Sequence, residues 1–568
     1  MTRADVERSS DADRREWDAT VRWTVVFCIP AAVFFGLRFF LLGQGGPAVS
    51  DSATYMALAK AVADGEGYSE IWRPFPTPHT YYPPGYPVLV AGLWKLWPKF
   101  PDNLLAIQLT SFVSYLIFLW RGQRLCLRHL PLREWQVALA GVVFATNYVA
   151  GLPAFAVGAD TLSALILIET VMLCTGMTEG IERARRELLR GAGLSALIAI
   201  GIYLRSINLD LLVGCVLALL VARRLLAAGL ILLSQLVLHG PWIVWVAAHG
   251  NSPSYVSNWL SMVNGASTLF EIMWNNGAAL VLEWIPRAIS TVFVSEQVCS
   301  GVARVLPFPL SPRAACSPFA VGLSVLTILG LATLLRRSRC FALTGVLGSL
   351  AVIVLLWPAT GAESITGGHA PRFLLPATLF LIAGTVLAVT RLCEKMRPSR
   401  HIPALVTALF VLLAAVPNAA QTLYYSVPLR EDIPILAISR QIQLDTDEIL
   451  RWTRRNTPGE AVIVSVAAIR AAPSFYLYSG RHAVDACIDG DGGVVAGLIP
   501  PGRPVYYVTW GKSPPLSRPT AGFVHRQGSI SGWTLSYQTQ RDVARVYVPS
   551  DGGEGTVPPG LCRPMRPI

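Results

Sequence analysis

Residues 191–222 read GAGLSALIAIGIYLRSINLDLLVGCVLALLVA. This apolar run is interrupted near its middle by three polar residues, Arg205, Asn208 and Asp210. One helix over the whole run would be far longer than the roughly 20 residues that a bilayer requires. Arginine clusters at 183–190 and 223–224 flank the run, and because basic loops stay in the cytoplasm, both ends belong on the same side of the membrane. The run therefore predicts two short helices that cross and return, and their junction at Arg205 must be buried in protein or line a wet cavity.

The composition places most of the chain in lipid. Of its 568 residues, 53% are hydrophobic and only 14% are charged, and the mean hydropathy is +0.48. These values are typical of a membrane protein rather than of several soluble domains. The formal net charge of +12 would suit nucleic acid only if Lys and Arg formed a continuous face. They lie between the apolar runs instead, so the charge is a signal of topology and no nucleic-acid partner is expected.

Apolar runs of about 17–25 residues predict the other membrane spans. These runs lie near 22–43, 103–120, 135–153, 161–178, 225–247, 318–335, 341–358, 373–390 and 403–425. With the broken pair, the total is about eleven transmembrane helices. The basic loops place the amino terminus in the cytoplasm and the carboxyl terminus outside, in a multi-pass protein of the inner (plasma) membrane. A signal peptide is the alternative for the first run, but its leader is long and partly acidic, so an uncleaved helix is expected.

The chain divides near residue 425 into a membrane part and a soluble part. In the second part, the sequence predicts an amphipathic helix over 440–456 and then short strands at 461–466, 505–510, 533–537 and 543–548. The predicted fold is an all-α polytopic membrane domain at 1–425 that carries an extracytoplasmic α/β domain at 426–568. Two cysteine pairs lie in segments that we expect outside the cytoplasm, Cys299–Cys316 and Cys487–Cys562. An oxidising compartment permits a disulfide bond in each pair, and the sequence does not decide whether it forms.

The first external segment, residues 43–102, contains the strongest candidate for chemistry. Asp51 opens the helical pattern DSATYMALA, with Tyr55 one turn further on. A carboxylate here can accept a proton from an acceptor hydroxyl at the membrane surface. On local sequence alone, Asp51 also fits a helix N-cap. Later in the segment, an apolar stretch too short to span predicts a helix at the interface, with Trp94 and Trp97 at the level of the headgroups.

Several short motifs together resemble the GT-C superfamily of integral-membrane glycosyltransferases. The resemblance is to the branch of protein O-mannosyltransferases, lipid A aminoarabinose transferases and RgtA-like bacterial enzymes. The motifs are Asp51-x-x-x-Tyr55-x-x-x-Ala59, Pro83-Pro-Gly-Tyr-Pro87, Ala159-Asp160-Thr161, Leu204-Arg205-Ser206 and Pro371-Arg372-Phe-Leu-Leu-Pro376. The likeness in layout covers nearly the whole chain, and it departs after Asp51, where the family often has a second acid and this chain has Ser52.

The resemblance implies a glycosyltransferase that takes sugar from a polyprenyl-phosphate donor on the outer face of the membrane. It implies that Asp51 activates the acceptor, which attacks the anomeric carbon opposite to the phosphate with inversion. Envelope glycan, lipid and protein are all candidate acceptors, membrane lipids surround the enzyme, and a divalent metal requirement stays open. The residues expected to bind substrate are Tyr55, Asp160, Arg205 and Arg372, which lie in these motifs, and His369, which the predicted topology places on the outer side beside Arg372.

A phosphate donor explains why cations are expected at this site. Cleavage leaves a polyprenyl phosphate with additional negative charge, which positive groups stabilise. Arg205 is the strongest candidate, because an arginine inside an apolar run is costly to bury unless it faces a cavity or a partner. Arg372 also fits an anchor at the interface, and Asp160 also fits a helix N-cap. No Cys-x-x-Cys pair and no histidine at metal-ligand spacing appears in the sequence, so no metal ligand is assigned.

Two other classes of protein share these features. A transporter or lipid flippase also has many spans and an arginine in a broken helix, but it usually has matching interruptions in two halves, whereas one broken pair is visible here. A non-catalytic scaffold would carry the outer domain as a binding module. Replacing Asp51 with Asn separates the classes, because an enzyme loses sugar transfer and still folds, whereas a scaffold is barely affected.

Overall fold

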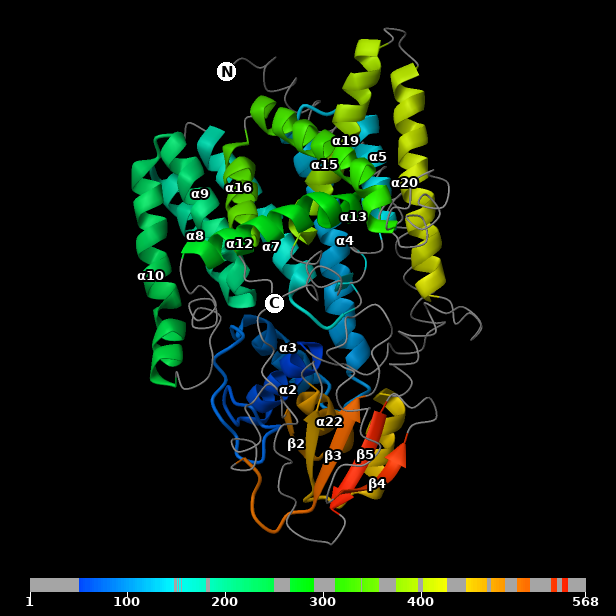
Figure 1. Cartoon of the computed structure of the whole chain (residues 1–568). Helices are drawn as coiled ribbons and strands as arrows, with labels where there is room; N and C mark the ends of the chain where they lie inside the picture. The colour runs from blue at the N-terminus through cyan, green and yellow to red at the C-terminus, as the bar shows by residue number, and fades with distance from the viewer. Residues whose placement is uncertain are drawn as a thin grey trace.

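The computed structural model describes most of the chain from Asp51 onward (Figure 1). The described residues are 51–147, 151, 153–154, 156–179, 184–249, 266–290, 312–338, 340–356, 374–396, 402–426, 446–466, 471–485, 498–510, 533–538 and 544–549. Figure 1 shows a bundle of helices above a smaller unit that contains a sheet, with the first described helices between the two.

Seven described helices are long and apolar enough to cross a membrane. They are α4 (Leu104–His129), α7 (Asp160–Glu179), α8 (Ala184–Leu204), α10 (Leu225–Ala248), α15 (Pro312–Arg337), α19 (Leu375–Met396) and α20 (Ile402–Ser426). Three shorter apolar helices join them: α5 (Glu134–Thr146), α9 (Leu209–Val221) and α16 (Phe341–Leu356). Together these helices correspond to every predicted span except the one at 22–43, which lies outside the described residues. The predicted helical membrane body is therefore confirmed.

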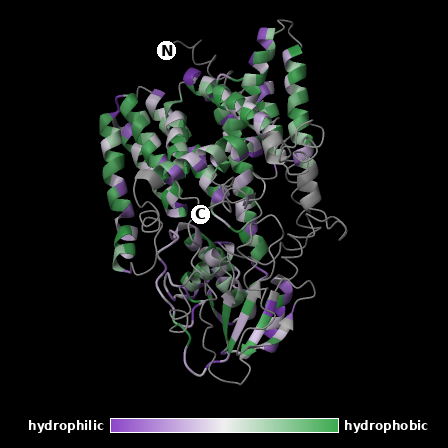
Figure 2. Ribbon diagram, in the orientation of Figure 1, coloured by the Kyte–Doolittle hydropathy of each residue, from purple (hydrophilic) through white to green (hydrophobic). Residues whose placement is uncertain are grey.

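The helices of the bundle consist mostly of hydrophobic residues (Figure 2), and many of these side chains are exposed. On α10, for example, Leu233, Leu236 and Val237 are 61–69% exposed. A soluble protein rarely exposes a continuous apolar surface of this kind, whereas lipid accommodates it. The chain is therefore a membrane protein.

A further helical segment that the sequence did not predict lies between α10 and α15. It consists of α12 (Ala266–Ala279), a π-helical turn η2 (Leu280–Trp284) and α13 (Ile285–Ile289). The side chain of Asn147, just after α5, donates to the carbonyl oxygen of Ala288 at 2.9 Å. This contact ties the segment to the membrane body.

The predicted break at Arg205 is present. α8 ends one residue earlier, Arg205 has an extended backbone (φ −154°, ψ 132°), and a single 3₁₀ turn, η1 (Ser206–Asn208), leads into α9. Asn208 Nδ2 donates to the carbonyl oxygen of Gly201 at 2.7 Å, and Asn208 Oδ1 accepts from Ser163 Oγ at 2.8 Å. Because backbone groups inside a membrane need partners, Asn208 makes this interruption of the helix tolerable.

Glycines bring two pairs of membrane helices into close contact. Between α15 and α19, a Cβ on Gly330 would overlap the carbonyl oxygen of Gly384, and one on Gly384 would lie 2.7 Å from the backbone nitrogen of Leu331. Between α9 and α16, a Cβ on Gly345 would lie 2.5 Å from the carbonyl oxygen of Gly214. Helices in lipid associate through such close packing, since lipid tails are as apolar as their side chains.

Two short helices, α2 (Asp51–Asp64) and α3 (Gly85–Leu96), pack against each other below the bundle (Figure 1). The helix predicted at the interface is present as α3. Trp94, which we expect at the level of the headgroups, is 3% exposed and stacks on Phe100 with ring centroids 5.7 Å apart, so its ring packs against protein. Trp97 is 57% exposed and can still reach that level. α3 is apolar on both faces, so the pattern alone does not say which tryptophan meets protein.

The C-terminal unit is a five-stranded sheet in the order β2-β1-β3-β5-β4. Its strands are β1 (Val462–Val466), β2 (His482–Asp485), β3 (Val505–Trp510), β4 (Trp533–Gln538) and β5 (Ala544–Pro549). β1 is parallel to β2 and β3, and β5 is antiparallel to β3 and β4. A helix at 446–456 and α22 (Ala472–Ser479) complete the sheet unit, which we define as the described residues of 446–549. The predicted α/β character is confirmed, and the sequence missed β2 and α22.

α2 is packed on both of its faces. On one side, Leu58 is fully buried in a hydrophobic cluster with Ile449 and Phe475 of the sheet unit. On the other side, Met56 is fully buried in a second cluster, which α3 and the ends of membrane helices complete. This double packing fixes the position of the first residue of α2, Asp51.

Candidate functional site

Asp51 opens α2 with a partly exposed side chain. Tyr82 donates its hydroxyl hydrogen to Asp51 Oδ1 with an oxygen–oxygen distance of 2.6 Å. This short distance is typical of a hydrogen bond to a carboxylate. The donor lies 31 positions away, directly before the motif Pro83-Pro-Gly-Tyr-Pro87, so the structure brings together two motifs that lie apart in the sequence.

Three tyrosine rings meet beside Asp51. Tyr55 contacts Tyr82 and Tyr86 with centroid distances of 4.9 and 5.1 Å, and it is 7% exposed. Burial raises the pKa of the Tyr86 hydroxyl well above its ordinary value, and the negative charge of nearby Asp160 acts in the same direction. Tyr86 is therefore a neutral hydroxyl at physiological pH. The aromatic cluster connects α2 with Asp160, the second predicted acid.

Asp160 and Arg205 form an ion pair through Oδ1 and Nη1, and their side chains are 10% and 13% exposed. Asp160 is the first residue of α7, and Arg205 is the extended residue at the break. Such pairing offsets much of the penalty for burying both charges. The sequence predicted each of the two residues as part of the site, and the structure adds that they contact each other.

The segment that carries the tyrosines is held against the break. Gly85 approaches the end of α8 so closely that a Cβ on it would lie 2.7 Å from both the carbonyl carbon and the carbonyl oxygen of Tyr203. Leu204 belongs to the same buried cluster as Tyr82 and Tyr86. These contacts make one continuous candidate site, which we define as Asp51, Tyr55, Tyr82, Tyr86, Asp160 and Arg205.

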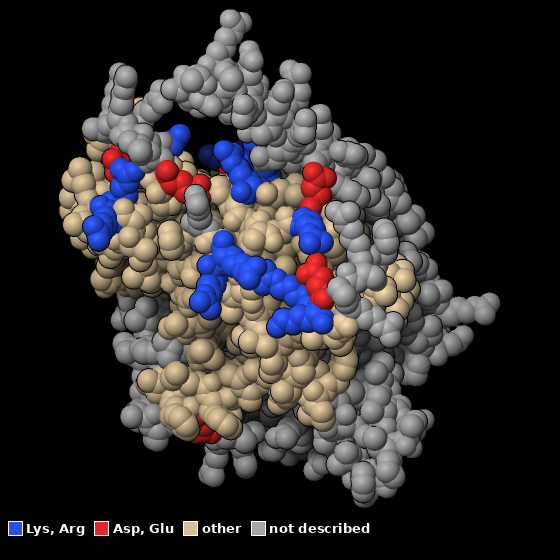
Figure 3. Space-filling model, turned by 90° about the horizontal axis from the view of Figure 1, so that it is seen from above, with Lys and Arg blue, Asp and Glu red and all other residues tan. Residues whose placement is uncertain are grey.

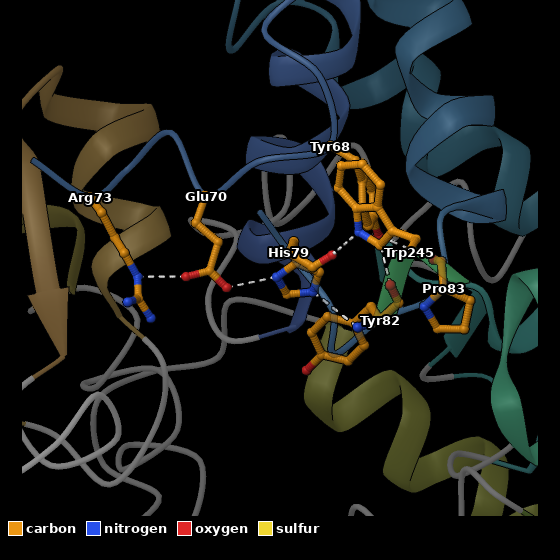
Figure 4. Close-up of polar contacts among 7 residues, drawn as sticks. All are labelled: Tyr68, Glu70, Arg73, His79, Tyr82, Pro83 and Trp245. Atoms are coloured by element: carbon orange, nitrogen blue, oxygen red, sulfur yellow. Dashed lines mark hydrogen bonds and ion pairs between the residues drawn. The ribbon is translucent and has the colours of Figure 1, made fainter. Parts of the chain in front are cut away.

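The sequence did not predict a buried polar network next to Tyr82 (Figure 4). Its central members are Glu70 and His79, which are 5% and 0% exposed. Both are ionisable residues in a loop otherwise rich in Tyr, Pro and Trp, and this contrast was the available signal. Their burial follows no helical or strand period, so the sequence alone does not reveal it.

Other predicted site residues lie outside the described part of the chain. His369 and Arg372 are among them, and so are Cys299, Cys487 and Cys562. The side chain of Cys316 is likewise not described, so both disulfides stay predictions. Among the described residues, the free cysteines are all buried, and no group of three or more His, Cys, Asp and Glu is arranged to hold a metal ion.

Comparison with known proteins finds similarity in structure. No protein-family model and no curated protein matches this sequence. The oligosaccharyltransferase AglB of Archaeoglobus fulgidus, solved with an inhibitory peptide and a dolichol-phosphate, matches with a TM-score of 0.50 and 13% identity over 86% of this chain and 69% of that one. ArnT of Cupriavidus metallidurans, bound to undecaprenyl phosphate, matches with a TM-score of 0.46 and 14% identity over 96% of this chain and 99% of that one. The mycobacterial arabinofuranosyltransferase AftD matches with a TM-score of 0.42 and 17% identity over 93% of this chain and 40% of that one.

At this level of identity the similarity concerns the fold. The match to AglB extends over most of both chains, so it includes more than a bundle of apolar helices. AglB is a glycosyltransferase of the GT-C superfamily. This chain therefore shares its fold with the oligosaccharyltransferase AglB, in agreement with the fold that the sequence motifs predicted.

Proposed function

We propose that this protein is a glycosyltransferase that moves a sugar from a polyprenyl-phosphate donor to an acceptor on the outer side of the membrane. In this proposal Asp51 takes the proton from the acceptor. The main support is that Asp51, the tyrosine cluster beside it and the Asp160–Arg205 ion pair lie together at the break in the membrane helices. The shared fold supports a lipid-phosphate donor, since AglB was solved with a dolichol-phosphate.

The distribution of charge supports a site on the outer side. Figure 3 looks onto the face of the bundle opposite the sheet unit, where Lys and Arg gather. Basic residues occupy the last turns of α4, α15 and α19, as Arg128, Arg336, Arg337 and Lys395. Positively charged helix ends stay in the cytoplasm. The candidate site lies at the opposite ends of the helices, at the start of α7 and the end of α8, so it faces outward with the sheet unit.

In the proposed reaction, the acceptor hydroxyl lies next to the Asp51 carboxylate. The carboxylate accepts the hydroxyl proton while the acceptor oxygen attacks the anomeric carbon of the sugar. The bond between that carbon and the phosphate oxygen breaks, and polyprenyl phosphate leaves with the electron pair. Attack opposite to the phosphate inverts the configuration, as the resemblance implies. The hydrogen bond from Tyr82 favours the ionised form of Asp51, which is the form that can accept a proton.

Arg205 is assigned to the donor phosphate. The leaving group gains negative charge, and a guanidinium already held in place stabilises this charge without further reorganisation. Asp160 supplies that fixation through the ion pair. Tyr55 is assigned to contact with the substrate. His369 and Arg372, outside the described residues, are assigned to the same phosphate.

Transfer from a panel of donors tests this function. The full-length protein in nanodiscs receives radiolabelled polyprenyl-phosphate mannose, glucose or arabinose, with envelope lipid, envelope glycan and a Ser/Thr peptide as acceptors. We expect label to move to one acceptor class and Asp51→Asn to lower the rate by about 100-fold or more. Asp64→Asn is the matched control, because Asp64 ends the same helix in a partly exposed ion pair with Lys60 and should keep the full rate.

Two results would contradict the proposal. Equal transfer by the wild type and by Asp51→Asn would remove Asp51 from the chemistry. Movement of intact donor lipid between leaflets with no transfer of label, measured in proteoliposomes, would identify a flippase instead.

A further inference from the structure

A buried polar network leads to the turn that carries Tyr82 (Figure 4). The ring of His79 is fully buried and stacks on the ring of Tyr82, with centroids 5.6 Å apart and an interplanar angle of 20°. His79 Nδ1 lies 2.7 Å from Glu70 Oε1, and His79 Nε2 lies 3.0 Å from the backbone nitrogen of Tyr82. Arg73 Nε lies 2.5 Å from the second oxygen of Glu70. A continuous series of polar contacts thus runs from Arg73 to Tyr82.

The partners of His79 determine where its hydrogen lies. The backbone N–H of Tyr82 can only donate, so Nε2 must accept and carries no hydrogen. The hydrogen of the neutral ring therefore lies on Nδ1, which donates it to Glu70. An imidazolium has a hydrogen on both nitrogens and would lose the bond from Tyr82. His79 is therefore a fixed structural link, and its ring is not placed to exchange protons with a substrate.

The same turn is also held through its carbonyl groups. Tyr68 donates its hydroxyl to the carbonyl oxygens of Tyr82 and Pro83, at 2.9 and 3.3 Å. Burial raises the pKa of the Tyr68 hydroxyl well above its ordinary value, so this group stays protonated and remains a donor. Trp245, near the end of α10, donates Nε1 to the carbonyl oxygen of His79 at 3.0 Å. The turn from His79 to Pro83 is therefore anchored to both the first external segment and the membrane body.

We propose that Glu70 and His79 are positioning residues for Asp51. They fix the backbone of Tyr82, and the hydroxyl of Tyr82 then meets Asp51 Oδ1 at 2.6 Å. A carboxylate held by a fixed donor keeps one orientation, whereas a mobile one must be ordered in every turnover. Glu70 acts through His79 and does not touch the substrate. This inference rests on the proposed role of Asp51 as proton acceptor.

A double-mutant cycle tests the order of action. With the radiolabelled polyprenyl-phosphate sugars of the panel above, we expect Tyr82→Phe to lower kcat about 10-fold and Glu70→Gln about 5-fold, with little change in KM. In the Tyr82→Phe background, Glu70→Gln should cause no further loss, because its influence passes through the Tyr82 hydroxyl. Glu66→Gln is the matched control, since Glu66 is exposed in the same loop. Losses that multiply in the double variant would overturn the proposal.

A conservative variant separates positioning from simple loss of packing. The amide oxygen of His79→Gln can still accept the backbone N–H of Tyr82, whereas His79→Ala leaves that buried donor without an acceptor. We expect His79→Gln to keep at least about 5-fold more kcat than His79→Ala at equal amounts of folded protein. Equal kcat for these two variants would overturn the role of the His79–Tyr82 bond.

The hydrogen on His79 gives a readout that does not depend on sugar transfer. The chain has 8 histidines, so a difference spectrum against His79→Gln assigns this ring by nitrogen solid-state NMR of the full-length protein in nanodiscs. We expect a protonated Nδ1 and a bare Nε2, unchanged in Asp51→Asn. A hydrogen on Nε2 in the wild type would overturn the network.

The two proposals fail in different ways. Full transfer by Asp51→Asn would overturn the proposed function, and the positioning role with it. Full transfer by Glu70→Gln, beside an inactive Asp51→Asn, would overturn the positioning role alone.

Discussion

Asp160→Asn should strongly destabilise the membrane body, because Arg205 keeps its charge at the helix break and loses its carboxylate partner. The two side chains are 10% and 13% exposed, so water screens them little. Two unit charges about 4 Å apart interact by about 4 kcal/mol at an effective dielectric constant of about 20. Removing one partner of a buried pair costs about 3–5 kcal/mol. Because both side chains keep some contact with water, we expect the free energy of unfolding to fall by about 3 kcal/mol, the lower end of this range.

The double variant Asp160→Asn with Arg205→Gln isolates the contribution of the charges. Two neutral amides can form a hydrogen bond across the same gap, and neither charge is left behind. We therefore expect the double variant to be more stable than either single variant, which is the sign of strong coupling between neighbouring residues. Sugar transfer should still be lost, because the guanidinium assigned to the donor phosphate is gone.

Reversible unfolding in mixed micelles, followed by fluorescence of the 16 tryptophans, measures these free energies. The control pair is Asp447–Arg451 in the sheet unit, whose side chains are 36% and 69% exposed. Breaking such a surface pair should change the free energy of unfolding by less than about 1 kcal/mol. If the double variant loses as much stability as the two single variants added together, Asp160 and Arg205 are not coupled as we expect.

Three further predictions concern helix contacts and pH. Gly330→Ala should lower the free energy of unfolding by about 1–3 kcal/mol, because the backbone of Gly384 cannot retreat, whereas Gly322→Ala on the same helix meets no atom and should be neutral. Gly85→Ala should lower sugar transfer about 10-fold by shifting α3 away from Tyr203, whereas Gly92→Ala on α3 meets no atom and should not. Burial, assisted by Arg503, lowers the pKa of His482 below its ordinary value, so the folded state binds fewer protons than the unfolded state. The sheet unit should therefore have its full stability above about pH 6.5 and lose stability at lower pH. Hydrogen exchange of the backbone amides of residues 482–485, corrected for the pH dependence of the intrinsic exchange rates, measures this loss. His482→Gln should remove the pH dependence.

The membrane body was predictable because lipid imposes a simple requirement on the sequence. Each span needs about 20 apolar residues, and its backbone groups must bond within the helix. The break at Arg205 could be found because the run at 191–222 is too long for one span while both of its flanks are basic. Strands β1, β3, β4 and β5 were found through their β-branched and aromatic residues.

The remaining features depend on contacts that no local pattern contains. β2 has only four residues, too few to show an alternation. Asp160 and Arg205 were each predicted, but they are 45 positions apart and nothing in either motif indicates that they pair. The link between Glu70 and His79 likewise joins positions nine apart in a loop, a spacing that no helical or strand period predicts. Single residues at the site were therefore predictable from their motifs, whereas the geometry that connects them was not.

The double packing of α2 limits how this protein can be rebuilt or recombined. The helix that presents Asp51 contributes Leu58 to the interior of the sheet unit, nearly 400 positions before Ile449, its neighbour there. A chimaera that receives a foreign segment for 446–549 must therefore also receive a matching segment for 51–64, or the acid loses its support. For protein engineering, the amino-terminal loop and the carboxyl-terminal domain are one exchangeable part, although the whole membrane body separates them in the sequence.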